Sequence, residues 1–180
     1  TVTSFELGKP VWFYRGYKTD GIFQNQAQVD AYKSSLGKVT FWSPTPGEPI
    51  VVDTNGDGDI NDQDKTDIGS PQPDFMIATT LDFAYKGFDL KFFLQGAFGG
   101  ENFMALARVD NPYSNRPSYF FDDRWTGEGS TNSFPKASSK DPIIYSSDLM
   151  VQDASYLKIR QIQLGYNFSP ELIKNAKMSS

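Results

Sequence analysis

An acidic segment at residues 53–64, which reads DTNGDGDINDQD, carries the most distinctive chemistry of the sequence. Its oxygen-bearing side chains recur at the spacing of a twelve-position calcium loop, and Gly58 stands at the sixth position, where such a loop turns sharply. Calcium prefers oxygen ligands, which carboxylates, amides and backbone carbonyls all supply. The pattern predicts a bound calcium ion held by the following residues: Asp53, Asn55, Asp57, Asp59, Asn61 and Asp64.

Three of these residues would bind the ion in different ways. Asp59 would offer its backbone carbonyl, and Asn61 would act through a water molecule, as the seventh and ninth positions of such loops do. Asp64 stands where Glu is usual, and its shorter side chain makes contact through both oxygens harder. Because Asn, Asp and Gly also favour turns, a solvated acidic turn is the alternative interpretation.

The flanks of the acidic segment favour a structural site. Residues 50–52 (IVV) resemble a strand, and residues 69–71 (GSP) leave no room for a following helix. A paired helix–loop–helix calcium switch is therefore not expected. We expect instead a clamp that holds a loop, with Ile60 packed beneath it.

The composition argues against several other kinds of site. The chain contains no Cys and no His, which excludes disulfides, zinc–thiolate centres and catalysis by a thiol or an imidazole. The net charge of −5 argues against a nucleic-acid partner. Asp122 and Asp123 are adjacent, so on a strand they would point to opposite faces, and a loop salt bridge with Arg124 is expected in place of shared acid–base work. We therefore expect no enzymatic activity.

Periodicity and composition predict an all-β fold in which residues 74–98 form a long hairpin. The fifteen Phe and nine Tyr favour strands. Apolar residues alternate on both sides of a tight turn at residues 86–87, and each arm has the ~9–11 residues with which a tilted strand crosses a bilayer. One face would carry Phe75, Ile77, Leu81, Phe83, Leu90, Phe92 and Leu94, and the other Asp82, Asp89, Lys91 and Gln95.

Other elements are expected around the hairpin. Residues 26–35 have weak helical spacing, with Gly37 as a stop. Residues 99–150 form a polar stretch longer than compact soluble domains usually carry between regular elements. The alternation within residues 151–168 predicts one long strand, and residues 171–178 are expected to form a brief helical turn.

Aromatic residues within the long polar stretch form a second candidate binding feature. They could stack on sugar rings, contact a protein partner or fold the loop upon itself. These residues are Tyr113, Tyr119, Phe120, Phe121 and Trp125.

Five segments, in their order and spacing, resemble the late, near-C-terminal barrel region of the SusC/RagA family of TonB-linked outer-membrane proteins. The similarity spans nearly the whole chain. The segments are LGKPVWFYRGYKTDGIFQNQ (7–26), VDTNGDGDINDQDKTDIGSPQPDF (52–75), YKGFDLKFFLQGAFG (85–99), DRWTGEGSTNSFPKAS (123–138) and VQDASYLKIRQIQLGYNFSPELI (151–173).

The resemblance implies an outer-membrane nutrient importer of the Bacteroidetes group. Such proteins build a large transmembrane β-barrel of antiparallel strands, ~22 of them, around a plug. A SusD-like surface lipoprotein caps the barrel, TonB acts through the plug, and the cargo is oligosaccharides in the first place, or peptides. Residues 1–180 would then be a partial barrel region with strands and extracellular loops, contacting outer-membrane lipid and the rest of the barrel, while the plug and the final strands lie elsewhere.

The turn at residues 86–87 assigns sides if it is periplasmic. The loops 53–64 and 99–150 would then be extracellular, the apolar hairpin face would contact lipid, and the polar face would line the lumen. The alternative is a soluble calcium-binding β-domain for carbohydrate binding or adhesion, with the same apolar face turned inward. Periodicity alone does not separate these two, because strands alternate in both.

Overall fold

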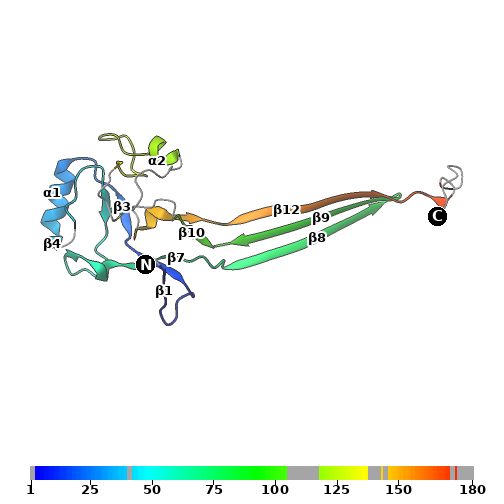
Figure 1. Cartoon of the computed structure of the whole chain (residues 1–180), viewed down its shortest axis with the longest axis horizontal. Coiled ribbons are helices and arrows are strands. Elements are labelled where there is room, and N and C mark those ends of the chain that lie inside the picture. Colours follow the sequence, from blue (N-terminus) through cyan, green and yellow to red (C-terminus); the bar gives the residue numbers. More distant parts are fainter. Residues whose placement is uncertain are drawn as a thin grey trace, which may run out of the picture. The chain divides into compact units, whose positions relative to one another are not determined.

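The computed structural model describes residues 3–39, 42–104, 118–137, 143, 146–170 and 173. The chain divides into two compact units (Figure 1). Unit 1 comprises Thr1–Gln72 and Glu101–Asp153, and unit 2 comprises Pro73–Gly100 and Ala154–Ser180.

Unit 2 is built on a three-stranded antiparallel sheet with the strand order β12-β9-β8. The predicted hairpin is confirmed as β8 (Phe75–Tyr85) and β9 (Phe88–Phe98), and β12 is Tyr156–Tyr166. The turn residues Lys86 and Gly87 both have positive φ angles, of 47° and 87°. Two-residue hairpin turns of this kind match the right-handed twist of the strands that they join.

The register of the sheet puts the apolar positions on one face. Leu81 lies opposite Phe92, and Phe92 lies opposite Ile162 of β12. The alternation of β12 is interrupted once, because the register shifts between Ile159 and Gln161. This bulge inserts Arg160 as an extra residue, so that the apolar positions on either side of it stay on the same face.

The prediction of one long strand over residues 151–168 is wrong. The structure divides it into β11 (Val151–Asp153), which pairs with β10 (Glu101–Phe103), and β12, which pairs with β9. The break lies opposite two consecutive glycines that separate β9 from β10. There the Gly99 N–H donates to the Ser155 hydroxyl at 3.1 Å, and the Ala154 N–H donates to the Gly100 carbonyl at 2.8 Å. The glycine turn on one side therefore ends the pairing on both.

Unit 1 consists of short strands, one helix and short helical turns (Figure 1). Its sheets are β1-β2-β7, β3-β5, β4-β6 and β10-β11, all antiparallel except for the parallel pair β4-β6. The fold class of antiparallel strands with minor helices is therefore confirmed for the described residues, with that one exception. The remaining elements are β1 (Thr3–Ser4), β2 (Phe13–Gly16), β3 (Thr19–Ile22), α1 (Gln26–Ser35), β4 (Lys38–Val39), β5 (Pro49–Val51), β6 (Asp59–Ile60), η1 (Asp62–Asp64), β7 (Thr66–Gly69), α2 (Tyr119–Asp122) and η3 (Asp148–Met150).

The predicted helix at residues 26–35 is confirmed as α1. The Asn25 side chain caps its N-terminus by accepting the Gln28 N–H, at 3.1 Å. The helix ends at Ser35, the following Leu36 is extended, and Gly37 donates its N–H to the Gly58 carbonyl at 2.7 Å. Gly37 thus connects the helix to the acidic segment. Within the part of the chain that the structure describes, no helix is long and apolar enough to span a membrane.

A small apolar core holds unit 1 together, and the acidic segment contributes to it. Ile60, at the eighth position of the segment, is fully buried, as the sequence predicts. It clusters with the buried residues Tyr17, Val51 and Ile143. Partly buried hydrophobic residues pack around this cluster: Tyr32, Leu36, Val39 and Trp42.

Truncation of Ile60 is expected to destabilise unit 1. We expect Ile60→Ala to lower the free energy of unfolding by about 2–5 kcal/mol, because it leaves a cavity in the core. The measurement is urea unfolding of the chain in detergent micelles, followed by tryptophan fluorescence, since Trp12, Trp42 and Trp125 all belong to unit 1. The control is Val52→Ala at an exposed position, and equal losses in both variants would contradict the assigned core.

Candidate functional site

The acidic segment folds back on itself around the carboxylate of Asp53. One oxygen of Asp53 accepts the Gly56 N–H at 2.7 Å, and the other accepts the Gly58 N–H at 2.8 Å. These glycines have φ angles of +74° and +80°, which side chains with a Cβ rarely adopt. The hydrogen bonds from Gly58 and Gly56 hold the pKa of Asp53 below its usual range, because they stabilise the charged form.

Two further ligand candidates are oriented by local turns. The Asn55 side-chain oxygen accepts the Asp57 N–H at 2.9 Å, and one Asp57 oxygen accepts the Asp59 N–H at 2.8 Å. The Asn55 side-chain amide also donates to the other Asp57 oxygen, at 2.9 Å. Such side-chain-to-backbone bonds mimic turns and are typical of Asn and Asp. They turn the side chains of the first, third and fifth positions back toward the segment's own backbone.

Asp64 closes the segment. Its side chain is fully buried, and its two oxygens accept the N–H groups of Thr54, at 3.0 Å, and Asn61, at 2.8 Å. The Thr54 hydroxyl also donates a hydrogen bond, to the Asp64 backbone carbonyl at 2.9 Å. The two ends of the segment are therefore joined through the twelfth position. Asp53 lies close enough to Asp64 for a side-chain interaction with it to contribute to the lowered pKa of Asp53.

Sequence reasoning missed that Asn61 and Asp64 also form a capping box around η1. The Asn61 side chain accepts the Gln63 N–H at 2.8 Å, while Asp64 accepts the Asn61 N–H. An Asn followed three residues later by an acidic residue is a signal that could have revealed it. The cap engages the Asn61 oxygen, and the Asn61 amide donates to the Asp59 carbonyl at 3.3 Å.

Two tyrosines, the buried Tyr17 and the partly buried Tyr32, anchor the segment within unit 1. The Tyr32 hydroxyl donates to the Val51 carbonyl at 2.5 Å, and the Tyr17 hydroxyl donates to Asp62 at 3.2 Å. Burial is the largest cause of the raised pKa of both phenols. The charges of Asp64 and Asp53 raise the pKa of Tyr32 further, and Asp62 does so for Tyr17. Both hydroxyls therefore stay protonated beside the acidic segment.

The predicted calcium ligands are only partly gathered. Among the described residues, no three Asp or Glu side chains come close enough to hold a metal ion by themselves. A calcium site in this segment would therefore need amide and backbone carbonyl oxygens beside its carboxylates, as calcium sites commonly do, and its carboxylates would have to move closer together. Binding through the Asp59 carbonyl and the Asn55 oxygen would exchange hydrogen bonds that the segment now makes within itself.

The paired carboxylates at residues 122 and 123 do not lie on a strand, which corrects the sequence-based argument. Residues 119–122 form the helical turn α2, and Asp122 and Asp123 are both exposed. The expected salt bridge with Arg124 is replaced by a hydrogen bond from its guanidinium to the Phe121 carbonyl. The guanidinium carbon also lies 5.6 Å from the centre of the Phe121 ring.

The aromatic residues of the long polar stretch differ in their exposure and contacts, where the structure describes them. Tyr113 lies outside the described residues, and the side chains of Tyr119 and Phe120 are not described either. Phe121 is exposed, whereas Trp125 is half-buried and donates its indole N–H to the Gln24 side chain at 3.1 Å. The Trp125 side chain thus connects its loop to Gln24, which lies outside the long polar stretch and which none of the alternatives named.

The Gln24 side chain joins this loop to the rest of unit 1. Its oxygen accepts the Gly129 N–H at 2.9 Å in addition to the indole of Trp125. Its amide donates to the carbonyls of Ile22 and Thr131, at 3.0 Å each. No local pattern in the sequence predicted this contact, because the partners lie more than one hundred residues apart.

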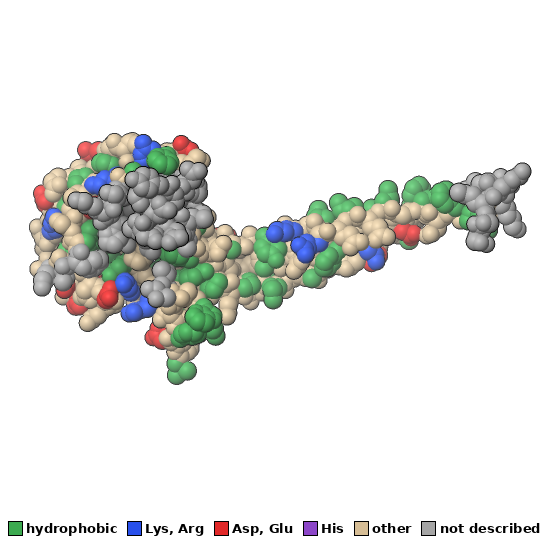
Figure 2. Space-filling model, in the orientation of Figure 1, with side chains coloured by type: hydrophobic (Ala, Val, Ile, Leu, Met, Phe, Trp, Pro, Cys, Tyr) green, Lys and Arg blue, Asp and Glu red, His purple; other side chains and the backbone are tan. Residues whose placement is uncertain are grey.

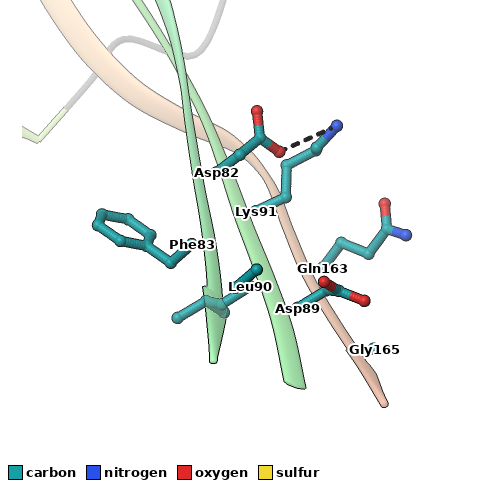
Figure 3. A pocket seen from close by; sticks show the side chains of 8 residues that line it. Asp82, Phe83, Asp89, Leu90, Lys91, Gln163 and Gly165 are labelled. Atoms are coloured by element: carbon teal, nitrogen blue, oxygen red, sulfur yellow. Dashed lines mark ion pairs between the residues drawn. The ribbon is translucent and has the colours of Figure 1, made fainter. Parts of the chain in front are cut away.

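The sheet of unit 2 presents one apolar and one mainly polar face, as the alternation predicts, and Met76 and Phe93 also lie on the polar face. Figure 3 shows Phe83 and Leu90 on one side of the strands, with Asp82, Lys91 and Asp89 on the other. Asp82 and Lys91 form a cross-strand ion pair at 3.1 Å. Apolar side chains gather along the strands (Figure 2), and the exposed ones on the apolar face are Phe75, Ile77, Leu81, Phe83, Tyr85, Phe88, Leu157, Ile159, Ile162, Leu164 and Tyr166.

Comparison with known proteins gives a consistent set of relatives. No family model matches the chain. TonB-dependent receptor P26 of Formosa agariphila is 30% identical over 171 residues, which is 92% of this chain and 16% of that protein. TonB-dependent receptor P3 of the same organism is 26% identical over 162 residues, which is 89% of the chain and 15% of that protein. TonB-dependent receptor SusC of Bacteroides thetaiotaomicron is 26% identical over 159 residues, or 80% of the chain and 15% of SusC.

The chain spans only 15–16% of the length of these curated relatives. The sequence similarity to these receptors extends over 80–92% of the chain's own length. The resemblance is therefore confirmed: the chain is similar over most of its length to a segment of SusC-like TonB-dependent receptors.

Proposed function

We propose that this chain forms part of the wall and the outer loops of a TonB-dependent outer-membrane importer. The observation that carries the proposal is the two-faced sheet of unit 2, together with the similarity to TonB-dependent receptors. Each of its strands has eleven residues, which suits a tilted transmembrane strand of ~9–11 residues. The role is structural, and the chain acts without catalysis.

The apolar face is suited to lipid. Leu164 is 69% exposed and Ile162 is 62% exposed, yet both share a face with Leu81 and Phe83, so large apolar side chains form a continuous surface. Monomeric soluble proteins rarely expose apolar patches of this kind. Hydrocarbon contact would cover this face without any change in the sheet.

The polar face is suited to the lumen. In the register, Asp82 lies opposite Lys91, and Lys91 lies opposite Gln163, so charges and amides form a row across the sheet. Outer-membrane barrels tolerate such groups on the inside, where water or a plug meets them. The ion pair between Asp82 and Lys91 then faces a polar surrounding.

The loops are assigned to the extracellular side. The tight turn at Lys86 and Gly87 is of the short kind that barrels have on the periplasmic side. The chain enters β8 and leaves β9 at the opposite end of the hairpin. Residues 53–64 precede that end in the sequence and residues 99–150 follow it, which supports an extracellular place for both.

The proposed cargo and partners rest on the resemblance to the SusC/RagA family. We propose oligosaccharides as the first cargo class, with peptides second, and a SusD-like lipoprotein as the partner on the extracellular side. TonB would act through a plug encoded outside this segment. The similarity to TonB-dependent receptor SusC supports an importer, and the exposed Phe121 offers a contact for a sugar ring or the lipoprotein.

The acidic segment is proposed as a structural calcium site. Asp53 is held ionised by backbone amides, and Asp64 joins the two ends of the segment. Calcium would add a cation to this acidic segment and would hold the loop that carries Ile60 into the core. The ligands would be Asp53, Asn55, Asp57, the Asp59 carbonyl, Asn61 through water, and Asp64.

The lipid contact is tested by placing a single cysteine on either face of β8. In the complete receptor, with any other cysteine removed, a fluorophore on Leu81→Cys should be quenched by brominated lipids, because Leu81 lies on the apolar face. A fluorophore on Thr80→Cys, one residue away on the polar face, should not be quenched. Absence of quenching at both positions would favour the soluble calcium-binding domain.

A charge on the apolar face should also be costly. We expect Leu81→Arg to lower the free energy of unfolding in lipid vesicles by about 2–4 kcal/mol, because arginine destabilises a barrel by this amount at the lipid face near the bilayer midplane. Thr80→Arg should have a much smaller effect. Guanidinium unfolding of the complete receptor in vesicles measures both, and equal costs would argue against the assignment of faces.

Calcium binding is tested by calorimetric titration of the chain with calcium chloride. We expect Asp53→Ala and Asp57→Ala each to weaken binding by about tenfold or more, since each removes a charged oxygen ligand. Asp62→Ala serves as the matched control, because Asp62 lies in the same segment but outside the proposed ligands. Binding that is unchanged after both ligand substitutions would remove the calcium proposal.

A further inference from the structure

The acidic segment contains two dipeptide steps that end in glycine, Asn55–Gly56 and Asp57–Gly58. Glycine has no side chain to hinder its backbone nitrogen, so that this nitrogen can attack the side-chain carbonyl carbon of a preceding Asn or Asp. The attack closes a succinimide ring. The segment therefore contains two steps that are chemically prone to spontaneous rearrangement.

The same carboxylate holds both attacking nitrogens. The Gly56 N–H donates to one oxygen of Asp53 at 2.7 Å, and the Gly58 N–H donates to the other at 2.8 Å. To react, each nitrogen must lose this proton and turn toward the preceding side chain. The hydrogen bond to Asp53 must break first in either case.

The side-chain carbonyl carbon of Asn55, which the Gly56 nitrogen would attack, is held in place as well. The Asn55 side-chain oxygen accepts the Asp57 N–H, and the Asn55 amide donates to the Asp57 carboxylate, both at 2.9 Å. The carboxamide is thus turned toward Asp57. Asn55 is exposed to water, so hydrogen bonding and not burial restrains the reaction.

We propose that Asn55–Gly56 is a deamidation site that Asp53 holds in check. In the reaction, a bond forms between the Gly56 nitrogen and the Asn55 Cγ, the bond from Cγ to Nδ2 breaks, and ammonia leaves with the proton of the Gly56 nitrogen. One water molecule then opens the ring at either carbonyl, which yields aspartate or isoaspartate at position 55. The product carries one more negative charge in the segment.

The Asp57–Gly58 step is restrained in the same way and provides a second readout. There the ring closes with loss of water and reopens by addition of water, so that Asp57 becomes isoaspartate without a change in mass. The restraint on both glycine nitrogens comes from the two hydrogen bonds to Asp53. It therefore does not rest on calcium binding, and calcium can be removed during the test.

The test compares the wild-type chain with Asp53→Ala during incubation at mildly alkaline pH in the presence of a calcium chelator. Peptide mapping by mass spectrometry follows the formation of aspartate and isoaspartate at residue 55 and of isoaspartate at residue 57. We expect both rates to rise about tenfold or more in Asp53→Ala, because a hydrogen bond to a charged group is lost at each glycine. A rate at residue 55 that equals the wild-type rate would overturn the proposal.

Two controls separate the local effect from unfolding. Asp62→Ala removes a carboxylate from the same segment that binds Tyr17 and Lys65 and no glycine amide, so the rates at residues 55 and 57 should stay unchanged. Asn132, which precedes Ser133 and accepts the Ile22 N–H at 2.7 Å, serves as an internal standard in every sample. An equal acceleration at Asn132 would show general loosening and would overturn the local role of Asp53.

If Asp53→Ala does not fold, Asp53→Asn provides the decisive comparison. Its side-chain oxygen can still accept one glycine N–H, but without the negative charge and without the second oxygen. We expect a rate at residue 55 or 57 between those of the wild-type chain and the chain unfolded in urea. A wild-type rate at both residues would contradict the proposal.

Discussion

Side chains along a β-strand alternate between two faces, and nearly every pairing in unit 2 preserves that alternation. The single exception, the bulge at Arg160, returns β12 to the same phase. The sheet therefore has two chemically different faces, with large apolar side chains on one and the Asp82–Lys91 pair on the other. The proposed wall between lipid and a polar lumen would satisfy both faces at once.

Unit 1 depends on a different device, in which carboxylates organise backbone. Asp53 and Asp64 each accept two N–H groups, and between them they close the acidic segment at both its glycine turns and its ends. Closure presents Ile60 to the apolar core, where Tyr17 and Val51 meet it. The polar segment and the apolar core therefore support each other, and a cation or a covalent change in the segment would be felt in the packing of unit 1.

Some features of both units could be predicted from residues that lie close together in the sequence. The hairpin turn at Lys86–Gly87, the two faces of β8 and β9, helix α1 and the packing of Ile60 all follow from residues within a few positions of one another. The expectation of a single strand over residues 151–168 failed because its pattern is continuous, while its partners are not. The glycines at 99 and 100 break the neighbouring strand, and the break is imposed across the sheet.

The sequence by itself determined the alternation of the strands, the turn residues and the oxygen-rich spacing of residues 53–64, because these depend on local backbone geometry. Only the tertiary structure decided which segments meet. It paired β4 with β6 in parallel, brought Gly37 to Gly58, and joined Gln24 to Trp125 across a long stretch of chain. Such contacts depend on the whole chain closing its hydrogen bonds and core together, which a local pattern does not encode.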